Sequence, residues 1–103
     1  MGMALVLTTY GSMEDAREIS GRMVRGGAAA CATIVRCDSI YEWEGSVRDE
    51  PEYMVLYKTA DAGAAALMAE VARTHPYDTP EIARIPVSNV HPPYMAWLAG
   101  QTR

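Results

Sequence analysis

One long extended segment, residues 28–45, constrains the fold of this chain more than any other feature. It is rich in β-branched and aromatic residues and contains no proline, which predicts a single strand. A strand of about 16 residues reaches about 50 Å, whereas an ordinary strand has about 5–6 residues. One small domain cannot supply neighbours along such a length, so the overhanging backbone groups stay unpaired. We therefore expect an obligate closed oligomer in which this strand pairs with another chain.

Three further extended segments accompany the long one. Residues 3–9 and 53–59 are short apolar runs, and the second is so apolar that it predicts a central strand covered on both faces. Residues 82–87 form a fourth strand, in which Pro86 indicates an edge or a bend. Residues 45–52 are polar and predict the turn of a hairpin between the long strand and the central one.

Helices are predicted between these strands. Ser12 stands at an N-cap position, and Gly26-Gly27 ends the helix that follows. Asp61 is expected to cap a second helix, which Pro76 ends. His91-Pro92-Pro93 opens a short last helix.

The resulting βαββαβ order predicts an α+β fold. Two right-handed crossovers and one hairpin give a split βαβ sheet of the ferredoxin-like type, with an added C-terminal helix. The chain has 103 residues, which is enough for one domain over residues 1–103.

Composition excludes several classes of partner. The net charge is −4 without a basic cluster, which argues against nucleic acid and anionic membranes. No apolar run approaches the roughly 18 residues of a membrane span, and the N-terminus lacks a signal-peptide core. Cys31 and Cys37 would lie about 20 Å apart on a regular strand, too far for a disulfide. We therefore expect a cytoplasmic protein with free thiols.

The segment from His75 to Glu81 concentrates polar chemistry. It reads His-Pro-Tyr-Asp-Thr-Pro-Glu, and its two prolines stiffen the backbone between a helix and a strand. His75 at a rigid helix end is suited to bind a metal ion or to titrate near neutral pH. Alternatively, its ring caps the helix by hydrogen bonding to free carbonyls.

Lys58 and Cys31 are further candidates. Lys58 closes an apolar strand and needs a partner, so Glu81 on a neighbouring strand is expected to pair with it. Such a pair is either structural or part of an anion or metal pocket at a subunit boundary. Cys31 lies among alanines, where a thiol is usually packing, although a thiolate also suits a soft metal such as Cu(I).

The hairpin segment alternates aromatic and acidic residues. Tyr41 and Trp43 alternate with Glu42 and Glu44, which predicts an aromatic face for contact between subunits and an acidic face in solvent. The chain has no Gly-rich phosphate loop, Cys-x-x-Cys, His-Glu-x-x-His or nucleophile elbow. We therefore predict that the protein is not an enzyme.

Five motifs in order resemble the CutA family of divalent-cation tolerance proteins. They are Ala29-Ala30-Cys31-Ala32, Tyr41-Glu42-Trp43-Glu44-Gly45, Lys58-Thr59, His75-Pro76-Tyr77 with Pro80-Glu81-Ile82, and Tyr94-Met95-Ala96-Trp97-Leu98. The resemblance covers nearly the whole chain. It implies a ferredoxin-like fold and a PII-like homotrimer whose long hairpins wrap neighbouring subunits, with a role in tolerance of copper and other divalent metals.

The resemblance also implies metal ligands. His75 matches the family's His-Pro-Tyr motif, Cys31 its Ala-Cys and Glu81 its Pro-Glu. Some relatives have a cysteine near the end of the first strand and a second histidine before His-Pro-Tyr. Thr8 and Thr74 stand at these places, so we expect binding of Cu(II) or another divalent metal to be weak.

Two functions therefore remain in view. The first is a non-enzymatic, trimeric, copper-binding protein of the metal ion response, with His75, Cys31 and Glu81 as ligands. The alternative is a PII-like signalling or scaffold trimer. Its intersubunit cleft would hold a small molecule or a partner protein, with Lys58, Tyr77 and Trp43 as lining residues.

Overall fold

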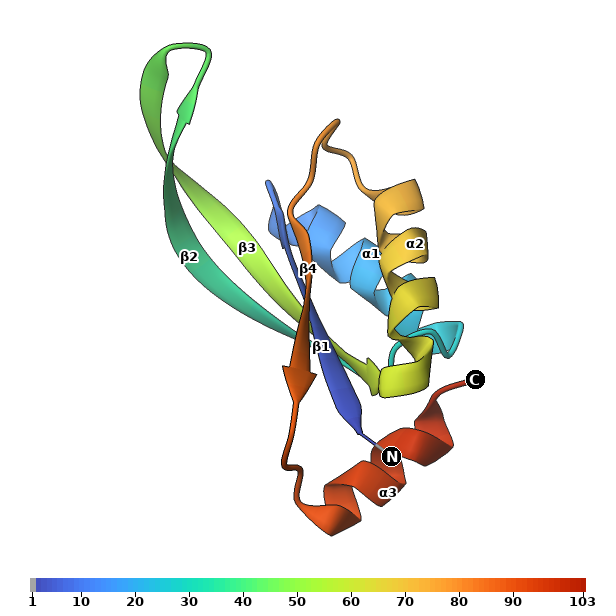
Figure 1. Ribbon diagram of the computed structural model, residues 1–103. Helices are drawn as coiled ribbons and strands as arrows, with labels where there is room; N and C mark the ends of the chain where they lie inside the picture. Colours follow the sequence, from blue (N-terminus) through green and yellow to red (C-terminus); the bar gives the residue numbers. More distant parts are fainter. Residues whose placement is uncertain (1) are drawn as a thin grey trace.

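A computed structural model describes residues 2–103 of the chain; Met1 of the predicted domain lies outside the described residues. Its strands and α-helices follow in the predicted order (Figure 1). The elements are β1 (Met3–Tyr10), α1 (Met13–Arg25), β2 (Cys31–Trp43), β3 (Ser46–Ala60), the 3₁₀ helix η1 (Asp61–Gly63), α2 (Ala64–Thr74), β4 (Ile82–Val87) and α3 (Pro92–Gln101). The strands form one antiparallel sheet in the order β2-β3-β1-β4, which confirms the ferredoxin-like fold with an added C-terminal helix.

Helix α1 has the predicted ends. The Ser12 side chain accepts a hydrogen bond from the Asp15 amide, which satisfies one free N–H of the first turn. At the other end, Gly27 adopts a positive φ of 76°. The amides of Gly27 and Ala28 then donate to the carbonyls of Val24 and Met23, the pattern of a Schellman motif. This closure turns the chain back toward the sheet, so β2 begins at Cys31 rather than at the predicted residue 28.

The hairpin of β2 and β3 projects from the body of the molecule, as Figure 1 shows. Its strands have 13 and 15 residues, and the molecule measures 46 × 25 × 21 Å. Glu44 and Gly45 have φ values of 49° and 82°, and Trp43 pairs with Ser46. Two successive positive φ values in a two-residue loop are typical of a type I′ turn, whose twist suits a hairpin.

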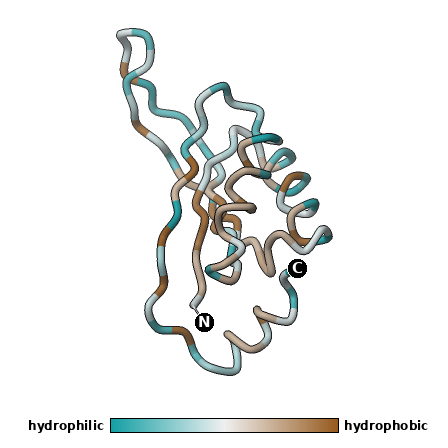
Figure 2. The backbone as a smooth tube through the Cα atoms, turned by 45° about the vertical axis from the view of Figure 1, so that its right-hand side comes forward, coloured by the Kyte–Doolittle hydropathy of each residue, from teal (hydrophilic) through white to brown (hydrophobic). Residues whose placement is uncertain are grey.

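The predicted turn over residues 45–52 is therefore wrong. Residues 46–52 are paired with β2, from Trp43 opposite Ser46 to Cys37 opposite Glu52. The overhang of the long strand, which was expected to stay unpaired, therefore has a partner strand within its own chain. Their polarity reflects solvent on the projecting hairpin, which Figure 2 shows as mostly hydrophilic with isolated hydrophobic positions. Charged residues in a strand that has no helix over it look like a turn in the sequence.

Helices α1 and α2 cover one face of the sheet. Alternate residues of β1 and β3 point into this core, including Val6, Tyr10 and Tyr57, and all three are fully buried. The remaining buried members come from the strands, the helices and the β2 connection: Ala16, Ile19, Met23, Ala29, Val55, Leu67 and Val71.

The opposite face of the sheet is only partly covered. Helix α3 packs Leu98 against one end of it, with Met3 and Ala30. Beyond that end lies an apolar surface that we call the open face, and half-buried or exposed side chains form it: Leu7, Val35, Met54, Leu56 and Ile85. Within one chain α1 and α2 cover one face of β3, whereas α3 reaches the other face only near Ala60, so the prediction of a strand covered along both faces is wrong for the single chain.

The start of α2 differs from the prediction, whereas the position of β4 in the sheet agrees with it. Asp61 does not cap α2; it begins η1, and its carboxylate pairs with Arg84 of β4. A 3₁₀ turn intervenes, so the carboxylate lies a turn too early to reach the first amides of α2. Strand β4 lies at the sheet edge, as Pro86 indicated.

Among residues 2–103, none of the helices combines the length and the apolar character needed to cross a membrane.

Candidate functional site

The ring of His75 links the end of α2 to the end of β1. His75 is the C-cap residue of α2, with extended backbone angles because Pro76 follows it. Its Nε2 lies 2.9 Å from the Thr9 carbonyl oxygen and 3.1 Å from Thr8 Oγ1. Its Nδ1 accepts a hydrogen bond of 3.1 Å from the Tyr77 amide. The ring therefore bonds to β1 and to its own loop, and the prediction that it caps the helix carbonyls is wrong.

These contacts define the protonation state of His75. A carbonyl only accepts, so Nε2 carries the proton, while Nδ1 uses its lone pair for the Tyr77 amide. The ring also stacks on Tyr10, with centroids 4.6 Å apart and planes 11° apart. Burial lowers the pKa of His75 below 6.5, although the Thr9 carbonyl opposes this shift. A metal ion at Nδ1 would have to displace the Tyr77 amide.

The lowered pKa of His75 predicts a loss of stability in mild acid. The unfolded histidine takes a proton below about pH 6.5, whereas the folded ring resists it. The contribution of His75 is therefore complete above that pH and is lost as the pH falls toward the lower folded pKa. Urea unfolding at pH 7.5, 6.5 and 5.5 measures this loss, which His75→Gln should reduce.

The other histidine provides the control for this experiment. His91 is exposed and makes no side-chain cap for α3. His91→Gln should therefore keep the pH dependence of the parent chain. If His75→Gln keeps the pH dependence of the parent chain, the loss of stability in mild acid does not come from His75.

A buried hydroxyl network lies behind the histidine. The hydroxyls of Tyr10 and Tyr57 are 2.8 Å apart, and Ser20 Oγ donates to the Tyr57 hydroxyl at 3.4 Å. Burial raises the pKa of both tyrosines, so the phenols stay protonated. Sequence reasoning missed this network. Its signal was the even spacing of Tyr10 with the core-facing residues of β1, which places a polar group in an otherwise apolar layer.

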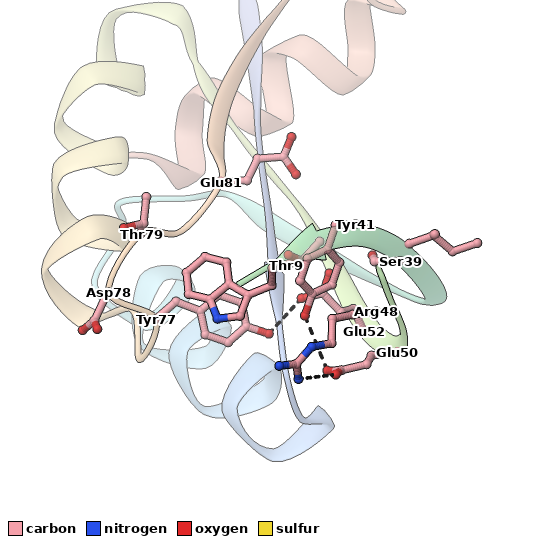
Figure 3. A pocket seen from close by; sticks show the side chains of 12 residues that line it. Thr9, Ser39, Tyr41, Arg48, Glu50, Glu52, Tyr77, Asp78, Thr79 and Glu81 are labelled. Carbon is pink, nitrogen blue, oxygen red and sulfur yellow. Dashed lines mark hydrogen bonds and ion pairs between the residues drawn. The ribbon is translucent and has the colours of Figure 1, made fainter. Parts of the chain in front are cut away.

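A cavity of about 570 Å³ opens between the hairpin, the end of β1 and the loop after α2. Aromatic rings and carboxylates predominate in its lining, and Figure 3 shows it at close range. The lining residues are Thr9, Ser39, Ile40, Tyr41, Trp43, Arg48, Glu50, Glu52, Tyr77, Asp78, Thr79 and Glu81.

Hydrogen bonds order one wall of this cavity. The Tyr77 hydroxyl donates to Glu52 Oε2 at 2.8 Å, and the Tyr41 hydroxyl lies 3.5 Å from Glu50 Oε2. Arg48 Nη1 is 3.5 Å from Glu50 Oε1 (Figure 3). Burial and the Glu52 carboxylate raise the pKa of Tyr77. Tyr41 and Trp43 lie on the face of β2 opposite Glu42, as the alternation predicted, but β3 adds Glu50 and Glu52 to the aromatic face, so that face is not free of acidic groups.

Two of the three residues predicted for a cleft, Trp43 and Tyr77, line this cavity, whereas Lys58 does not. Lys58 donates to Thr33 Oγ1 at 2.9 Å. The predicted Lys58–Glu81 pair is absent from the ion pairs of residues 2–103. The antiparallel register explains this: Lys58 is opposite Leu5, in the row of Ile85, whereas Glu81 precedes the start of β4.

The predicted metal ligands are not brought together. Glu81 is exposed, and both it and His75 lie near the end of β1, where Ile82 is opposite Thr8. Cys31 is half-buried near the other end of the sheet. It is opposite Lys58 in the β2–β3 ladder, and its side chain lies against Tyr94. Within residues 2–103, His, Cys, Asp and Glu form no group of three or more placed to hold a metal ion.

Thr8 and Thr74, which stand where some relatives have a cysteine and a second histidine, differ in their surroundings. Thr8 is fully buried, with its hydroxyl 3.1 Å from His75 Nε2. Thr74 is turned back along its helix, where its hydroxyl donates to the Glu70 carbonyl at 2.9 Å. Residue 8 is thus beside the histidine, as a ligand position would be, while Thr74 points to its own helix.

Comparison with known proteins gives a consistent result. The model of the family "CutA1 divalent ion tolerance protein" matches residues 4–101. The divalent-cation tolerance protein CutA of Thermus thermophilus is 37% identical over 99 residues, which cover 95% of this chain and 96% of that protein. The CutA protein of Pyrococcus horikoshii is 31% identical over 101 residues, which cover 98% and 99%.

The chain also differs in length from some of its relatives and closely matches the solved structures of others. The chain spans about half the length of the chloroplastic CutA proteins of Arabidopsis thaliana and Oryza sativa, 55% and 56%. The crystal structure of CutA1 from Pyrococcus horikoshii superposes with a TM-score of 0.94 at 30% identity, covering 97% of this chain and 98% of that one. The Thermus thermophilus structure gives 0.89 at 36% identity, covering 98% and 99%. The chain belongs to the CutA1 divalent ion tolerance family.

Proposed function

We propose that this protein acts in divalent-metal tolerance as a non-enzymatic homotrimer, and that it binds Cu(II) or another divalent ion at sites completed by a neighbouring chain. The open face carries the proposal of an assembly. Val35 and Ile85 are each 39% exposed there, beside the half-buried Leu7, Met54 and Leu56. A continuous apolar sheet face of this kind is characteristic of a protein interface.

The hairpin supports the same proposal. Its end exposes Ile40 at 71% and Val47 at 72%, far from the core of its own chain. The projecting strands also present backbone groups that another chain can pair with. Contact with neighbouring subunits would remove both apolar side chains from water.

The separation of the ligands supports a shared metal site. Cys31, Glu81 and His75 are distributed over two ends of the sheet, and a divalent ion needs several donors at once. A neighbouring chain would supply the missing donors. Of the three candidates, Cys31 has a half-buried thiol, Glu81 has an exposed carboxylate, and His75 must first release the Tyr77 amide.

A copper titration of metal-free protein against a competing chelator tests the proposal. The wild type should take up copper, and Cys31→Ser, Glu81→Gln and His75→Ala should each be compared with it. His91→Ala, which changes an exposed histidine, is the matched control and should bind like the wild type. Loss of one ligand should weaken binding at least as much as loss of an outer-shell partner, which costs roughly 10–100-fold in metal affinity.

Two results would contradict the proposal. Uptake no better than weak surface binding would exclude metal binding. Equal copper affinity in the wild type and in a monomeric variant, such as the Val35→Asp variant described in the Discussion, would exclude a site shared between chains.

The cavity favours a second candidate function, a PII-like signalling or scaffold trimer. We propose that this trimer takes a small molecule in the cavity bounded by Trp43 and Tyr77. Its volume of about 570 Å³ lies within the usual range for small-molecule sites, about 300–1,000 Å³.

A further inference from the structure

Three aromatic side chains converge on the cavity described above. Tyr41, Trp43 and Tyr77 line it and are 42%, 52% and 37% exposed. Two come from β2 and one from the loop after α2, so the fold assembles them from separate segments. Large rings that stay half in solvent around one hollow leave their π faces available to a ligand.

The charges beside these rings are mainly negative. The cavity lining contains four carboxylates and one guanidinium, that of Arg48. Arg48 pairs with Glu50, while Glu52 accepts a hydrogen bond from Tyr77 and forms no ion pair within residues 2–103. Figure 3 shows Glu50 and Glu52 on the side of the two phenols, with Asp78 and Glu81 farther out. The Glu52 carboxylate therefore lies beside the Tyr77 phenol without an ion-pair partner among the described residues.

We infer that this cavity binds a small organic cation of the alkylammonium class. Aromatic faces attract an ammonium group through their quadrupoles, and a carboxylate nearby adds a direct charge interaction. An anion would meet repulsion from four carboxylates, and a neutral apolar ligand would desolvate Glu52 without compensation. A bare metal ion uses oxygen, nitrogen or sulfur donors and gains little from three rings.

The directions of the tyrosine pKa shifts agree with this geometry. Burial first, and then the Glu52 and Glu50 carboxylates, raise the pKa of Tyr77. Burial, Glu50 and Glu52 also raise the pKa of Tyr41, against the influence of Arg48. A cavity that disfavours a negative phenolate favours a positive ligand.

This inference deepens the second proposed function, because it names the ligand class of that same cavity, and it does not depend on metal uptake. The test uses three probes of one shape and different charge. They are choline, its uncharged analogue 3,3-dimethylbutan-1-ol and the anion 3,3-dimethylbutanoate. Each is titrated into the full-length protein, and the two indole N–H resonances are followed by NMR. Trp97→Leu assigns the Trp43 signal by removing the other one.

Choline is expected to shift the Trp43 resonance saturably, and the other two probes should shift it weakly or not at all. Glu52→Gln keeps an oxygen acceptor for Tyr77 and should weaken choline binding about threefold to tenfold. Glu42→Gln removes the same charge from an exposed hairpin position outside the cavity lining and should leave the affinity unchanged.

The aromatic contribution is measured separately by calorimetry. Trp43→Leu should weaken choline binding about threefold to tenfold. The control is Trp97→Leu, because Trp97 is 46% exposed, close to the 52% of Trp43, and lies on α3 outside the cavity lining.

Several outcomes would overturn the inference. If no probe binds to the assembled protein, the cavity does not take small organic molecules of this shape, and the second proposed function fails with the inference. If the alcohol or the carboxylate binds as tightly as choline, the cavity takes a small molecule of another class, and only the inference of a cation fails. Equal weakening by Glu42→Gln and Glu52→Gln would mean a nonspecific response to net charge, which also overturns it.

Discussion

Val35→Asp is expected to convert the proposed trimer into separate chains at micromolar concentration. Val35 lies on the edge strand β2 and belongs to the open face, where it is opposite Met54 of β3 and 39% exposed in the single chain. Assembly through this face would bury the new carboxylate without a cation beside it. An uncompensated buried charge costs about 3–5 kcal/mol, and the penalty arises once in each chain.

Light scattering after size-exclusion chromatography measures the effect. The wild type should have three times the 11.2 kDa chain mass, and the variant should have the mass of one chain. The fold of the single chain should persist, because Val35 already faces partly into solvent and is not a member of the helix-covered core. Circular dichroism of the variant checks this point.

Val24→Asp is the matched control. Val24 is 40% exposed, almost the same as Val35, but it lies on the outer surface of α1. The same substitution there changes the same charge and similar exposed area, so the trimer should survive. A trimeric Val35→Asp protein would show that the open face is not the interface, and a monomeric wild type would remove the proposed assembly altogether.

The fold was predictable because its signals are local. Ser12, the Gly26-Gly27 pair and Pro76 each act through their own backbone, so helix ends could be predicted without knowing what packs against them. The long strand was predictable from composition, and so was the second half of its partner strand, whereas residues 46–52 of that partner were not. Residues 46–52 look like a turn because polarity reports solvent, and the turn itself needs only Glu44 and Gly45.

The site was less predictable because it depends on register. Lys58 lies on β3 and Glu81 directly precedes β4, and β1 lies between these two strands. The antiparallel pairing of β1 places Lys58 and Glu81 toward opposite ends of the sheet. The contact between His75 and Thr9 spans 66 residues, so no local pattern reports it. The contact between Tyr41 and Glu50 likewise depends on the register of the hairpin, which the sequence pattern does not specify.

Tyr57→Ala is expected to lower the free energy of unfolding by about 3–5 kcal/mol, the usual range for truncating a large buried aromatic side chain. Tyr57 is fully buried in the C-terminal part of β3, and its ring contributes to the main core cluster. The truncation also leaves the Tyr10 hydroxyl without the partner 2.8 Å away, and Tyr10 in turn stacks on His75. Urea unfolding at constant protein concentration measures the loss.

Phenylalanine variants separate the hydroxyl pair from the packing. Tyr57→Phe keeps the ring but leaves the Tyr10 hydroxyl unpaired, which should cost about 1–3 kcal/mol. Tyr10→Phe added to it removes that unpaired hydroxyl, so the double variant should lose less than the sum of the two single variants. Strictly additive losses would show that the 2.8 Å contact contributes no coupling energy. Sub-additive losses would show that the two phenols stabilise the core as a pair, directly behind the ring that joins α2 to β1.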